Sequence, residues 1–380
     1  SFQNVNLFLY KFLYVKICTM DICDNNLYYI GGIVRDELLG VNKHFDIDLT
    51  YQGDAIEFAK NIPNADIIQI NESFGTVKIK IDGKEIDIAS TRGETYPKKG
   101  HLPQVKNIGC DLKEDILRRD FTVNALAKST STGEIIDYVG GLADLKTKTL
   151  RVLHDGSFID DPTRIIRGLK FAVRFGFELE PHTKFLQDEY LKNINYDMSY
   201  KRLKKELVET FNLNRWSAFK LFVENKMYKL ITSKEFVLPS FDFSHLIDKY
   251  KPENTWIIYI GLLSDISVLP LSKIEKKIVD GFVNLKAKTF TDDFEIFKNF
   301  SDVNTESVIM YSTINAEVVE RYFEILKDIR IKITGIDLIN LGQKPSENFQ
   351  KCFDVVLREK LKNPALTKEQ EIEVAKLFFS

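Results

Sequence analysis

The sequence predicts an α+β protein in which a mixed α/β part is followed by an all-helical remainder. Strand-like segments with two-residue alternation, interspersed with short helical segments, fill the chain up to about residue 145. Beyond that point the strand signals fade, and residues 160–175, 199–211, 217–231 and 316–329 repeat their apolar residues at helical spacing. A chain of 380 residues is long enough for two or more packed units.

Glycines and turn residues separate the elements of the mixed part. The first strand is expected to end at Gly31-Gly32, and the short helix that follows is closed by Gly40. Asp82-Gly83 joins two strands in the manner of a hairpin turn. The expected strands are residues 26–32, 45–51, 65–71, 76–83 and 84–91, and the expected helices are residues 33–40 and 54–62.

Composition and charge describe a protein without a basic excess. The charged fraction is 28% and the formal net charge is −2, so any nucleic-acid contact must come from local clusters of Lys and Arg. The four cysteines form no CxxC pair and no zinc-like spacing, which favours reduced thiols in an intracellular protein. The apolar stretch at residues 2–18 contains two lysines and is too short to span a bilayer, so we expect a helix packed on the core.

Two aspartates in the strand at residues 45–51 are the first candidates for chemistry. Asp46 and Asp48 are two residues apart, so in a strand both carboxylates point to the same face. Their mutual repulsion is relieved by a cation, and Mg²⁺ prefers such hard oxygen ligands together with substrate phosphates. Asp87 on a neighbouring strand is a candidate third carboxylate for a two-metal centre. The alternative is that the two aspartates only form a solvent-exposed strand face.

The glycine pair before the first helix favours the metal-site interpretation. At a strand-to-helix turn, Gly31-Gly32 allows backbone N–H groups to approach an anion, and the helix N-terminus adds favourable partial charge. Arg35 stands one turn into that helix, within reach of a phosphate. Each signal is weak alone, since a glycine turn can be simply a turn. Together they predict phosphate donors and metal ligands on adjacent elements, as nucleotidyl transfer requires.

A second unusual stretch is residues 116–127, in which Arg118, Arg119 and Asp120 precede what we expect to be an apolar helix. In a functional interpretation an arginine neutralises a triphosphate, while Asp120 and Asn124 hydrogen-bond a ribose. In a structural interpretation Asp120 or Thr122 caps the helix and the arginines form a solvated edge. The residues alone do not separate these alternatives.

The helix predicted from Asp161-Pro162 onward carries Arg164 and Arg167 on one face. Cytosine and adenine both present an exocyclic amine beside a ring-nitrogen acceptor, which an Asp carboxylate and an Arg guanidinium can satisfy together. Uracil and guanine present the reverse order and would leave both side chains unsatisfied, at a cost of about 1–3 kcal/mol per group. The pair Asp161–Arg164 could therefore select C and A without a nucleic-acid template. A merely solvated arginine face is the alternative.

In this order, the patterns G-G-x-V-R-D…D-x-D, R-R-D-F-T-x-N-A, D-x-x-G-G-x-x-D-L and D-D-P-x-R-x-x-R resemble the class II tRNA nucleotidyltransferases. These are the CCA-adding enzymes, related to bacterial poly(A) polymerases within the polymerase-β superfamily. The resemblance covers about residues 28–210. It implies a polymerase-β-like nucleotidyltransferase head at residues 1–146, a helical neck with the nucleotide template at 147–211, a helical body at 212–280 and a helical, tRNA-binding tail at 281–380.

Residue by residue, the resemblance implies that Gly32 and Arg35 contact the nucleotide and that Asp46 and Asp48 hold the metals, two Mg²⁺ ions. Asp87, placed on the neighbouring strand by the argument above, completes the catalytic candidates. An arginine of the pair Arg118-Arg119 would touch the triphosphate, with Asp120 and Asn124 near the ribose. Asp161 and Arg164 would read the base, with Arg167 close by. Listed in full, the nucleotide-binding candidates are Gly31, Gly32, Arg35, Arg118, Arg119, Asp120, Asn124, Asp161, Arg164 and Arg167.

The chain departs from the family pattern in three places. The template motif usually begins Glu-Asp and here begins Asp160-Asp161, and a third family arginine is replaced by Lys170, which lacks the bidentate fork. Residues 92–107 occupy the place of the family's flexible loop, with Lys98-Lys99 where an acidic residue is common. CC-adding relatives typically lack much of this loop, so its presence favours CCA or A addition.

The sequence therefore predicts a template-independent enzyme that adds CCA to the 3′ end of tRNA from CTP and ATP, releasing pyrophosphate. It is expected to work in the cytoplasm, or in an organelle matrix, without a membrane partner. The lysine runs at residues 201–205 and 273–277 either contact tRNA or are solvated helix faces. An A-adding enzyme or a poly(A) polymerase shares these motifs. A silent RNA-binding relative would have damaged carboxylates, and a small-molecule nucleotidyltransferase would not need the long helical body.

Overall fold

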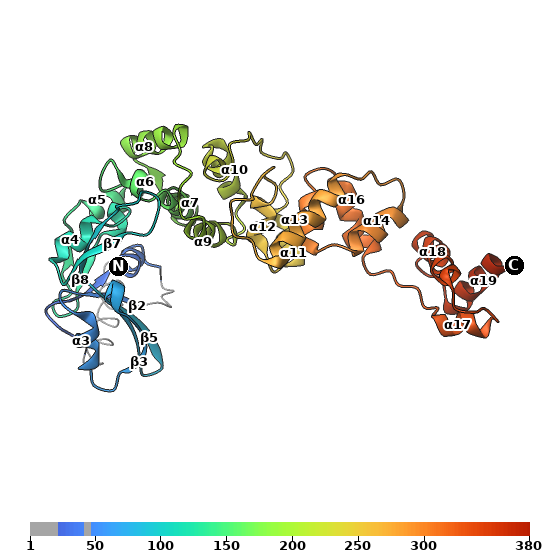
Figure 1. The fold of residues 1–380 in the computed structure, drawn as a ribbon, viewed down its shortest axis with the longest axis horizontal. Coiled ribbons are helices and arrows are strands. Elements are labelled where there is room, and N and C mark those ends of the chain that lie inside the picture. The colour runs from blue at the N-terminus through green and yellow to red at the C-terminus, as the bar shows by residue number, and fades with distance from the viewer. Residues whose placement is uncertain (1–21, 42–46) are drawn as a thin grey trace, which may run out of the picture. The chain divides into compact units, whose positions relative to one another are not determined.

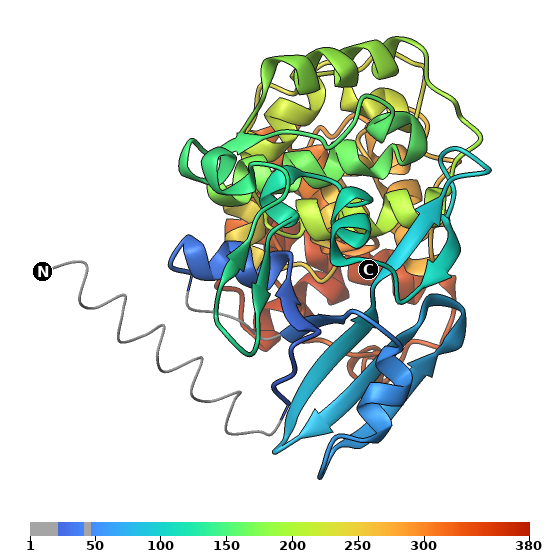
Figure 2. The same ribbon diagram turned by 90° about the vertical axis from the view of Figure 1, so that its left-hand side faces the viewer.

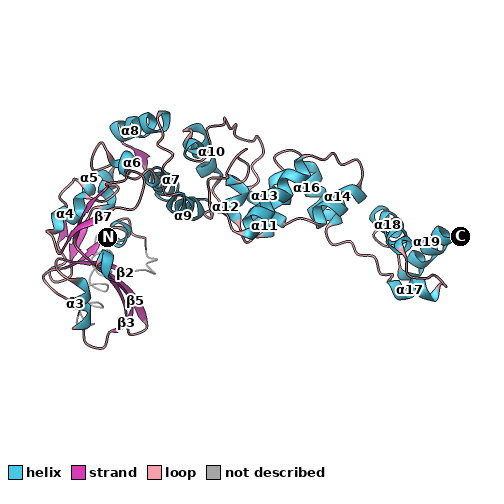
Figure 3. Cartoon of the chain, in the orientation of Figure 1, coloured by secondary structure: helices cyan, strands magenta, loops and turns pink. Residues whose placement is uncertain are grey.

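The computed structural model describes residues 22–41 and 47–380 (Figure 1). Asp46 and the expected N-terminal helix lie outside these residues. The chain divides into two compact units. The first extends to Glu206 and includes Asn225–Leu230, and the second comprises Leu207–Glu224 and Ile231–Ser380. The first unit contains a mixed sheet and the second is helical, which confirms the predicted α+β class (Figure 3).

The first unit is built on a seven-stranded sheet of order β3-β4-β5-β2-β1-β8-β9. The pair β2–β5 is parallel, and the other neighbouring pairs are antiparallel. The parallel register places Asp48 directly opposite Asp87. The strands are β1 (Leu27–Ile30), β2 (Ile47–Tyr51), β3 (Asp66–Asn71), β4 (Thr76–Ile81), β5 (Lys84–Ser90), β8 (Ala127–Ser129) and β9 (Ile135–Ile136).

Alternating side chains give strands β4 and β5 two different faces. Ile79 and Ile88 are buried on the face covered by helix α3 (Ala55–Lys60), which lies beside these strands in Figure 2. Lys78 and Asp87 are on the opposite face. The predicted hairpin turn is confirmed, because both turn residues have positive φ, with Asp82 at 49° and Gly83 at 78°.

Short helices and small sheets complete the first unit. Helix α2 begins directly after Gly31, whose φ of 71° favours glycine, and the chain after this helix passes through Gly40, also at positive φ. The helices are α2 (Gly32–Leu38), α4 (Leu112–Leu117), α5 (Gly141–Lys146), α6 (Ser157–Asp160), α7 (Thr163–Phe175), α8 (Pro181–Lys192) and α9 (Tyr200–Phe211), which ends in the second unit. The small sheets pair β6 (Arg92–Thr95) with β7 (Gln104–Ile108), and β10 (Thr149–Leu150) with β11 (Glu178–Leu179).

The expectation of an apolar helix after Arg118-Arg119-Asp120 is wrong. The chain instead forms a single 3₁₀ turn, Thr122–Asn124, and continues into strand β8. A short, fully buried apolar run has no periodicity that separates helix from strand. Pairing with β1 on one side and β9 on the other determines the strand here.

The second unit packs helices around buried aromatic rings. Phe211, Phe219 and Tyr259 lie with their ring centroids 5.3–6.2 Å apart. No helix within the described residues is long and apolar enough to cross a membrane. The helices are α10 (Trp216–Glu224), α11 (Ser244–Tyr250), α12 (Thr255–Ile260), α13 (Lys273–Lys286), α14 (Asp293–Ser301), α15 (Thr305–Tyr311), α16 (Ala316–Arg321), α17 (Gly335–Asn340), α18 (Glu347–Lys362) and α19 (Lys368–Phe379).

Candidate active site

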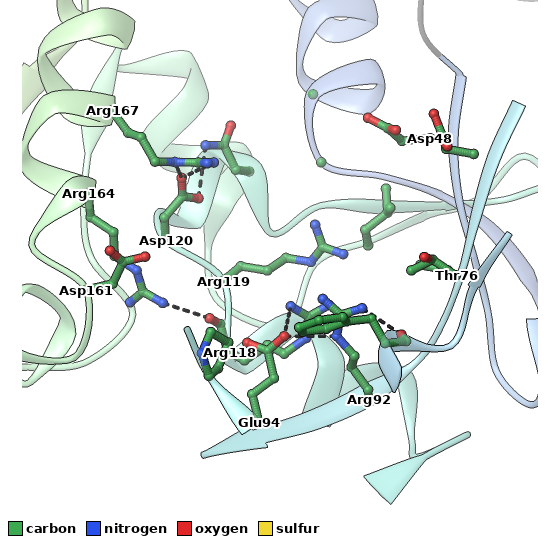
Figure 4. A pocket seen from close by; sticks show the side chains of 18 of the residues that line it. Asp48, Thr76, Arg92, Glu94, Arg118, Arg119, Asp120, Asp161, Arg164 and Arg167 are labelled. Atoms are coloured by element: carbon green, nitrogen blue, oxygen red, sulfur yellow. Dashed lines mark hydrogen bonds and ion pairs between the residues drawn. The ribbon is translucent and has the colours of Figure 1, made fainter. Parts of the chain in front are cut away.

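One cavity of about 730 Å³ in the first unit brings the candidate residues together (Figure 4). Strands β2 and β5 form one side, and helix α7 with the segment before it forms another. Every sequence-predicted site residue within the described chain lines this cavity. They are Gly31, Gly32, Arg35, Asp48, Asp87, Arg118, Arg119, Asp120, Asn124, Asp161, Arg164 and Arg167.

The strand side of the cavity carries accessible carboxylates. Asp48 is exposed, and its register partner Asp87 has a 47% exposed side chain. Lys78 Nζ lies 3.1 Å from Asp87 Oδ2 and 3.5 Å from an oxygen of Glu85. No cluster of three ligating side chains is found among the described residues, which exclude Asp46. Two carboxylates at one register nevertheless form a hard-oxygen donor pair, which fits Mg²⁺.

The glycine turn lies against the arginine pair. A Cβ atom added to Gly31 would be 3.2 Å from Arg119 Nη1 and 3.5 Å from the carbonyl oxygen of Asn124. The backbone contact is an ordinary one and Arg119 Nη1 is the end of a flexible side chain, so it is the positive φ of Gly31 that favours glycine here. The turn therefore brings bare backbone and a guanidinium together at the cavity wall, as an anion site requires.

The two neighbouring arginines have different surroundings, which the sequence did not distinguish. Arg118 donates from Nε and Nη2 to Asp115 Oδ1, at 3.0 and 2.7 Å, and from Nη1 to Glu94 Oε1 at 2.9 Å. Arg119 donates from Nη2 to Asp115 Oδ2 at 3.0 Å, and its buried Nε has no partner among the described residues. Figure 4 shows the Arg119 side chain extending across the cavity. Of the two, Arg119 is the one positioned to receive an anion.

Asp115 is a site residue that sequence reasoning missed. It is fully buried and supports both arginines. Burial opposes its charge, but Arg119 and Arg118 hold the pKa of Asp115 below its usual value. Its position three and four residues before the arginines is the signal that could have identified it.

Asp120 is the centre of a second buried network. Its Oδ1 accepts from the Phe121 backbone N–H at 2.8 Å and from Asn124 Nδ2 at 3.1 Å. Its Oδ2 accepts from Arg167 Nε at 2.8 Å, and Arg167 Nη2 lies 2.7 Å away. Burial opposes the charge, but Arg167 and the hydrogen bond from Asn124 lower the pKa of Asp120 to about 2. Both oxygens thus have two donors each, so Asp120 serves as a scaffold and is not a helix cap.

The predicted base-reading pair is buried at the start of α7. Asp161 is 4% exposed and Arg164 is 3% exposed, which rules out a solvated face for Arg164. Asp161 Oδ1 accepts from the backbone N–H and the hydroxyl of Thr163, and its Oδ2 accepts from Arg202 Nη2 at 2.5 Å. Arg202 was not among the predicted site residues, although it lies in the family-like stretch "MSYKRLKKEL".

Arg164 also connects three parts of the cavity wall. Its Nη1 donates to Ser157 Oγ at 2.6 Å, and its Nη2 donates to the Arg118 carbonyl at 3.0 Å and to Tyr96 Oη at 3.3 Å. These contacts hold the guanidinium in one plane at the cavity surface. A planar donor next to a carboxylate is the arrangement that reading one edge of a base requires.

The loop between β6 and β7 contacts the same region. Lys99 Nζ donates to Asp160 Oδ1 at 2.5 Å, and the Gly100 backbone N–H donates to the Asp160 carbonyl at 3.0 Å. Arg202 Nη1 donates to the His101 carbonyl at 3.2 Å. The shorter Asp160 and the basic Lys99, both departures from the family pattern, are therefore partners in this chain.

Comparisons with known proteins agree with this geometry. Residues 27–151 match the family model described as Poly A polymerase head domain. An A-adding tRNA nucleotidyltransferase of Halalkalibacterium halodurans is 30% identical, covering 93% of this chain and 89% of the relative. A second A-adding tRNA nucleotidyltransferase, from Geobacter sulfurreducens, is 32% identical over 92% of this chain, which spans only 44% of that relative's length.

Two further matches carry the CCA-adding name. A CCA-adding enzyme of Lactobacillus helveticus is 27% identical, covering 93% of this chain and 94% of the relative. A solved structure of a CCA-adding enzyme in an apo form has a TM-score of 0.77 and 24% identity, covering 98% of this chain and 95% of that one, a likeness that concerns the fold. From the cavity and these similarities together, the chain belongs to the class II tRNA nucleotidyltransferase family of the polymerase-β superfamily.

Proposed function

We propose that this chain transfers AMP from ATP to the 3′ end of tRNA and releases pyrophosphate. The observation that carries the proposal is the single cavity that holds the glycine turn, the carboxylates of β2 and β5, and the Asp161–Arg164 pair. A phosphate-binding turn, metal-binding carboxylates and a base-reading pair are the parts that template-independent nucleotidyl transfer needs. The two A-adding relatives described above, each matching over nine-tenths of this chain, support AMP as the transferred group.

The residues have separate roles in this proposal. Gly31-Gly32 and Arg119 bind the triphosphate through backbone N–H groups and a guanidinium. Asp46 and Asp48 would hold Mg²⁺, with Asp87 beside them, and Mg²⁺ when bound supplies charge neutralisation at the transferring phosphate. Asp161 accepts a hydrogen bond from the exocyclic amine of adenine, and Arg164 donates one to the adjacent ring nitrogen.

Full CCA addition from CTP and ATP, as the sequence predicts, is the second candidate. It is supported by the relative named a CCA-adding enzyme, which matches over nearly its whole length. It is supported also by the chemistry of the template pair, because cytosine and adenine share the amine and ring nitrogen that Asp161 and Arg164 satisfy. The two candidates differ in whether the cavity also accepts CTP.

The experiment that separates them uses three tRNA substrates, which end before CCA, after C and after CC. Each is incubated with the purified protein and labelled CTP or ATP. We expect AMP on the CC-ended tRNA, and CMP on the two shorter substrates only if the second candidate is correct. Failure to label the CC-ended tRNA with ATP would overturn both.

The proposed division of the chain is a head at residues 1–146, a neck at 147–211, a body at 212–280 and a tail at 281–380. The helical part that follows the head is proposed to hold the tRNA. Lys273, Lys276 and Lys277 line a separate cavity of about 370 Å³ in the second unit, which supports a phosphate contact there. Replacing these lysines with alanine should weaken tRNA binding and reduce its salt dependence, because fewer counterions are released. Unchanged binding at every salt concentration would assign the lysines to a solvated face.

A further inference from the structure

Part of the cavity wall has no role in binding the nucleotide as proposed above. It is formed by the 3₁₀ turn Glu72–Phe74, by the neighbouring ends of β4 and β5, and by the start of β6. Figure 4 shows Thr76 and Arg92 of this part away from Asp161. The lining residues concerned, none of them among the predicted site residues, are Phe74, Thr76, Ala89 and Arg92.

Phe74 and Arg92 form a paired surface in this part of the cavity, here called the platform. Arg92 Cζ lies 5.2 Å from the ring centroid of Phe74. Arg92 Nη1 donates to the Phe74 carbonyl at 2.8 Å, and its Nε donates to Glu94 Oε1 at 2.9 Å, so the guanidinium is held beside the ring. Both residues are half-buried. Aromatic rings and guanidinium planes are the surfaces on which unpaired bases of RNA stack.

The backbone after Phe74 holds the ring close to the end of β5. Gly75 has a φ of 59°, and a Cβ atom added to it would be 2.9 Å from Ser90 Oγ. The Ser90 backbone N–H donates to the Gly75 carbonyl at 2.8 Å. This close approach fixes the platform directly beyond Thr76, the first residue of β4.

The platform lies along the same sheet face as the carboxylates. Thr76 pairs with Ala89 in the ladder between β4 and β5. Asp87 is two residues before Ala89, so its side chain is on the same face, about 6.5 Å farther along the strand. A nucleoside whose base lies on the platform would place its ribose over the small side chains of Thr76 and Ala89. Its 3′-oxygen would then face Asp87.

The order of the strands puts the carboxylates between the platform and the glycine turn. Strands β4, β5, β2 and β1 are consecutive neighbours in the sheet. The platform adjoins β4, Asp87 and Asp48 are on β5 and β2, and β1 leads into Gly31-Gly32. Phosphoryl transfer requires the attacking and leaving oxygens to lie on opposite sides of the phosphorus. With the leaving pyrophosphate at the glycine turn, the attacking hydroxyl must approach from the platform.

We propose that Phe74 and Arg92 form the acceptor subsite, on which the base of the 3′-terminal nucleotide of the tRNA stacks while its 3′-hydroxyl faces Asp87. The inference rests on the proposed function, because it places the second substrate of the same cavity. Stacking engages the face of a base and does not read its edge. The platform therefore holds the terminal base without selecting it, and selection of the incoming nucleotide stays with Asp161 and Arg164.

The first test changes the acceptor and leaves the protein intact. A CC-ended tRNA is compared with the same tRNA lacking only the base of its last nucleotide. From the usual contribution of one stacked base we expect KM for the tRNA to rise about 5- to 100-fold. KM for ATP should stay within about twofold. An unchanged KM for the tRNA would overturn the proposal.

The second test changes the platform. Phe74→Leu should raise KM for the CC-ended tRNA about five- to tenfold, and Phe74→Trp should keep it within about twofold. Phe185→Leu is the matched control, because Phe185 is a 57% exposed aromatic residue of the first unit that does not line the cavity. On the acceptor without its last base, Phe74→Leu should match the wild type, because the stacking partner is already absent. Equal losses on both acceptors would refute stacking on Phe74.

A readout without transfer separates the acceptor subsite from the proposed function. A fluorescent cytosine analogue at the 3′ end of the tRNA reports stacking as quenching when the protein binds in the absence of ATP. We expect quenching with the wild type and Phe74→Trp, and its loss with Phe74→Leu. The same result in a protein that transfers no AMP would support the subsite and refute the activity. AMP transfer with equal quenching in the wild type and Phe74→Leu would support the activity and overturn the subsite.

Discussion

The two sides of the cavity use their carboxylates in opposite ways. On the strand side, Asp48 and Asp87 are accessible to solvent, and the nearby cation is the partly exposed Lys78. On the helical side, Asp115, Asp120 and Asp161 are at most 7% exposed, and each is held by two or more donors. Burying a charge is costly unless internal partners satisfy it, whereas an accessible carboxylate can receive an external cation. The comparison indicates that the carboxylates of the helical side are committed to internal partners, whereas those of the strand side remain accessible to a ligand.

The strand side is tested most severely by Asp48→Ala. An accessible carboxylate that holds Mg²⁺ matters to the reaction and not to folding. We expect AMP transfer to fall by at least about 1,000-fold, with the melting temperature changed by no more than about 1 °C. Single-turnover incorporation and calorimetric melting measure the two quantities. Retained transfer, or a large loss of stability, would remove the contrast between the two sides.

The helical side is tested by Asp120→Asn, which should cost stability in a pH-dependent way. Burial disfavours the charge, but Arg167 and Asn124 hold the pKa of Asp120 at about 2, below its ordinary value of 3.8. A lowered pKa stabilises the folded state above the unfolded pKa, and this contribution is lost as the pH falls toward 2. The free energy of unfolding of the wild type should therefore fall by about 2–3 kcal/mol between about pH 5 and pH 2, with roughly half of the loss reached by pH 3. Asp120→Asn should not show this loss. Urea unfolding of both proteins at several pH values measures the difference, and parallel pH curves would contradict it.

The glycine turn joins the two sides, and Gly31→Ala should disturb both. Gly31 has a φ of 71° and a ψ of −121°, a conformation that residues other than glycine rarely adopt, so a Cβ there costs about 1–3 kcal/mol of stability, and it would approach Arg119 Nη1. Gly40→Ala is the matched control, because its φ is 72° and nothing lies within 4 Å of the added atom. We expect both variants to lose stability but a raised KM for ATP, several-fold, only in Gly31→Ala. An equal KM for ATP in both variants would show that the glycine turn does not contact the triphosphate.

The smallest effect is expected from Lys78→Ala. Lys78 lies beside Asp87 and Glu85 and competes with a cation for their charge. Its removal should lower the Mg²⁺ concentration for half-maximal transfer by about two- to threefold, a small change because solvent screens exposed ion pairs. Lys80→Ala is the control, since Lys80 lies opposite Glu85 and not Asp87. A raised Mg²⁺ requirement would show that Lys78 supports the site.

Local signals in the sequence were sufficient for several parts of the structure. The Asp82-Gly83 hairpin, the helix after Gly31-Gly32 and the start of α7 near Asp161-Pro162 depend on backbone preferences of a few adjacent residues. The alternation around Asp48 likewise fixes the face of its strand. Such features depend on neighbouring residues and not on the rest of the fold, so the sequence alone was enough to predict them.

Long-range contacts decided the rest. Whether Arg118 or Arg119 has capacity for an anion depends on Glu94, which is 24 residues away from Arg118. The burial of Arg35 depends on Phe171 and Phe175 of a distant helix, and pairing between strands replaced the expected helix after Asp120. The residue types present were plain in the sequence. Their burial and hydrogen-bond partners arise only when distant segments pack together. These features distinguish a charged side chain that holds its neighbours in place from one that is accessible to a ligand.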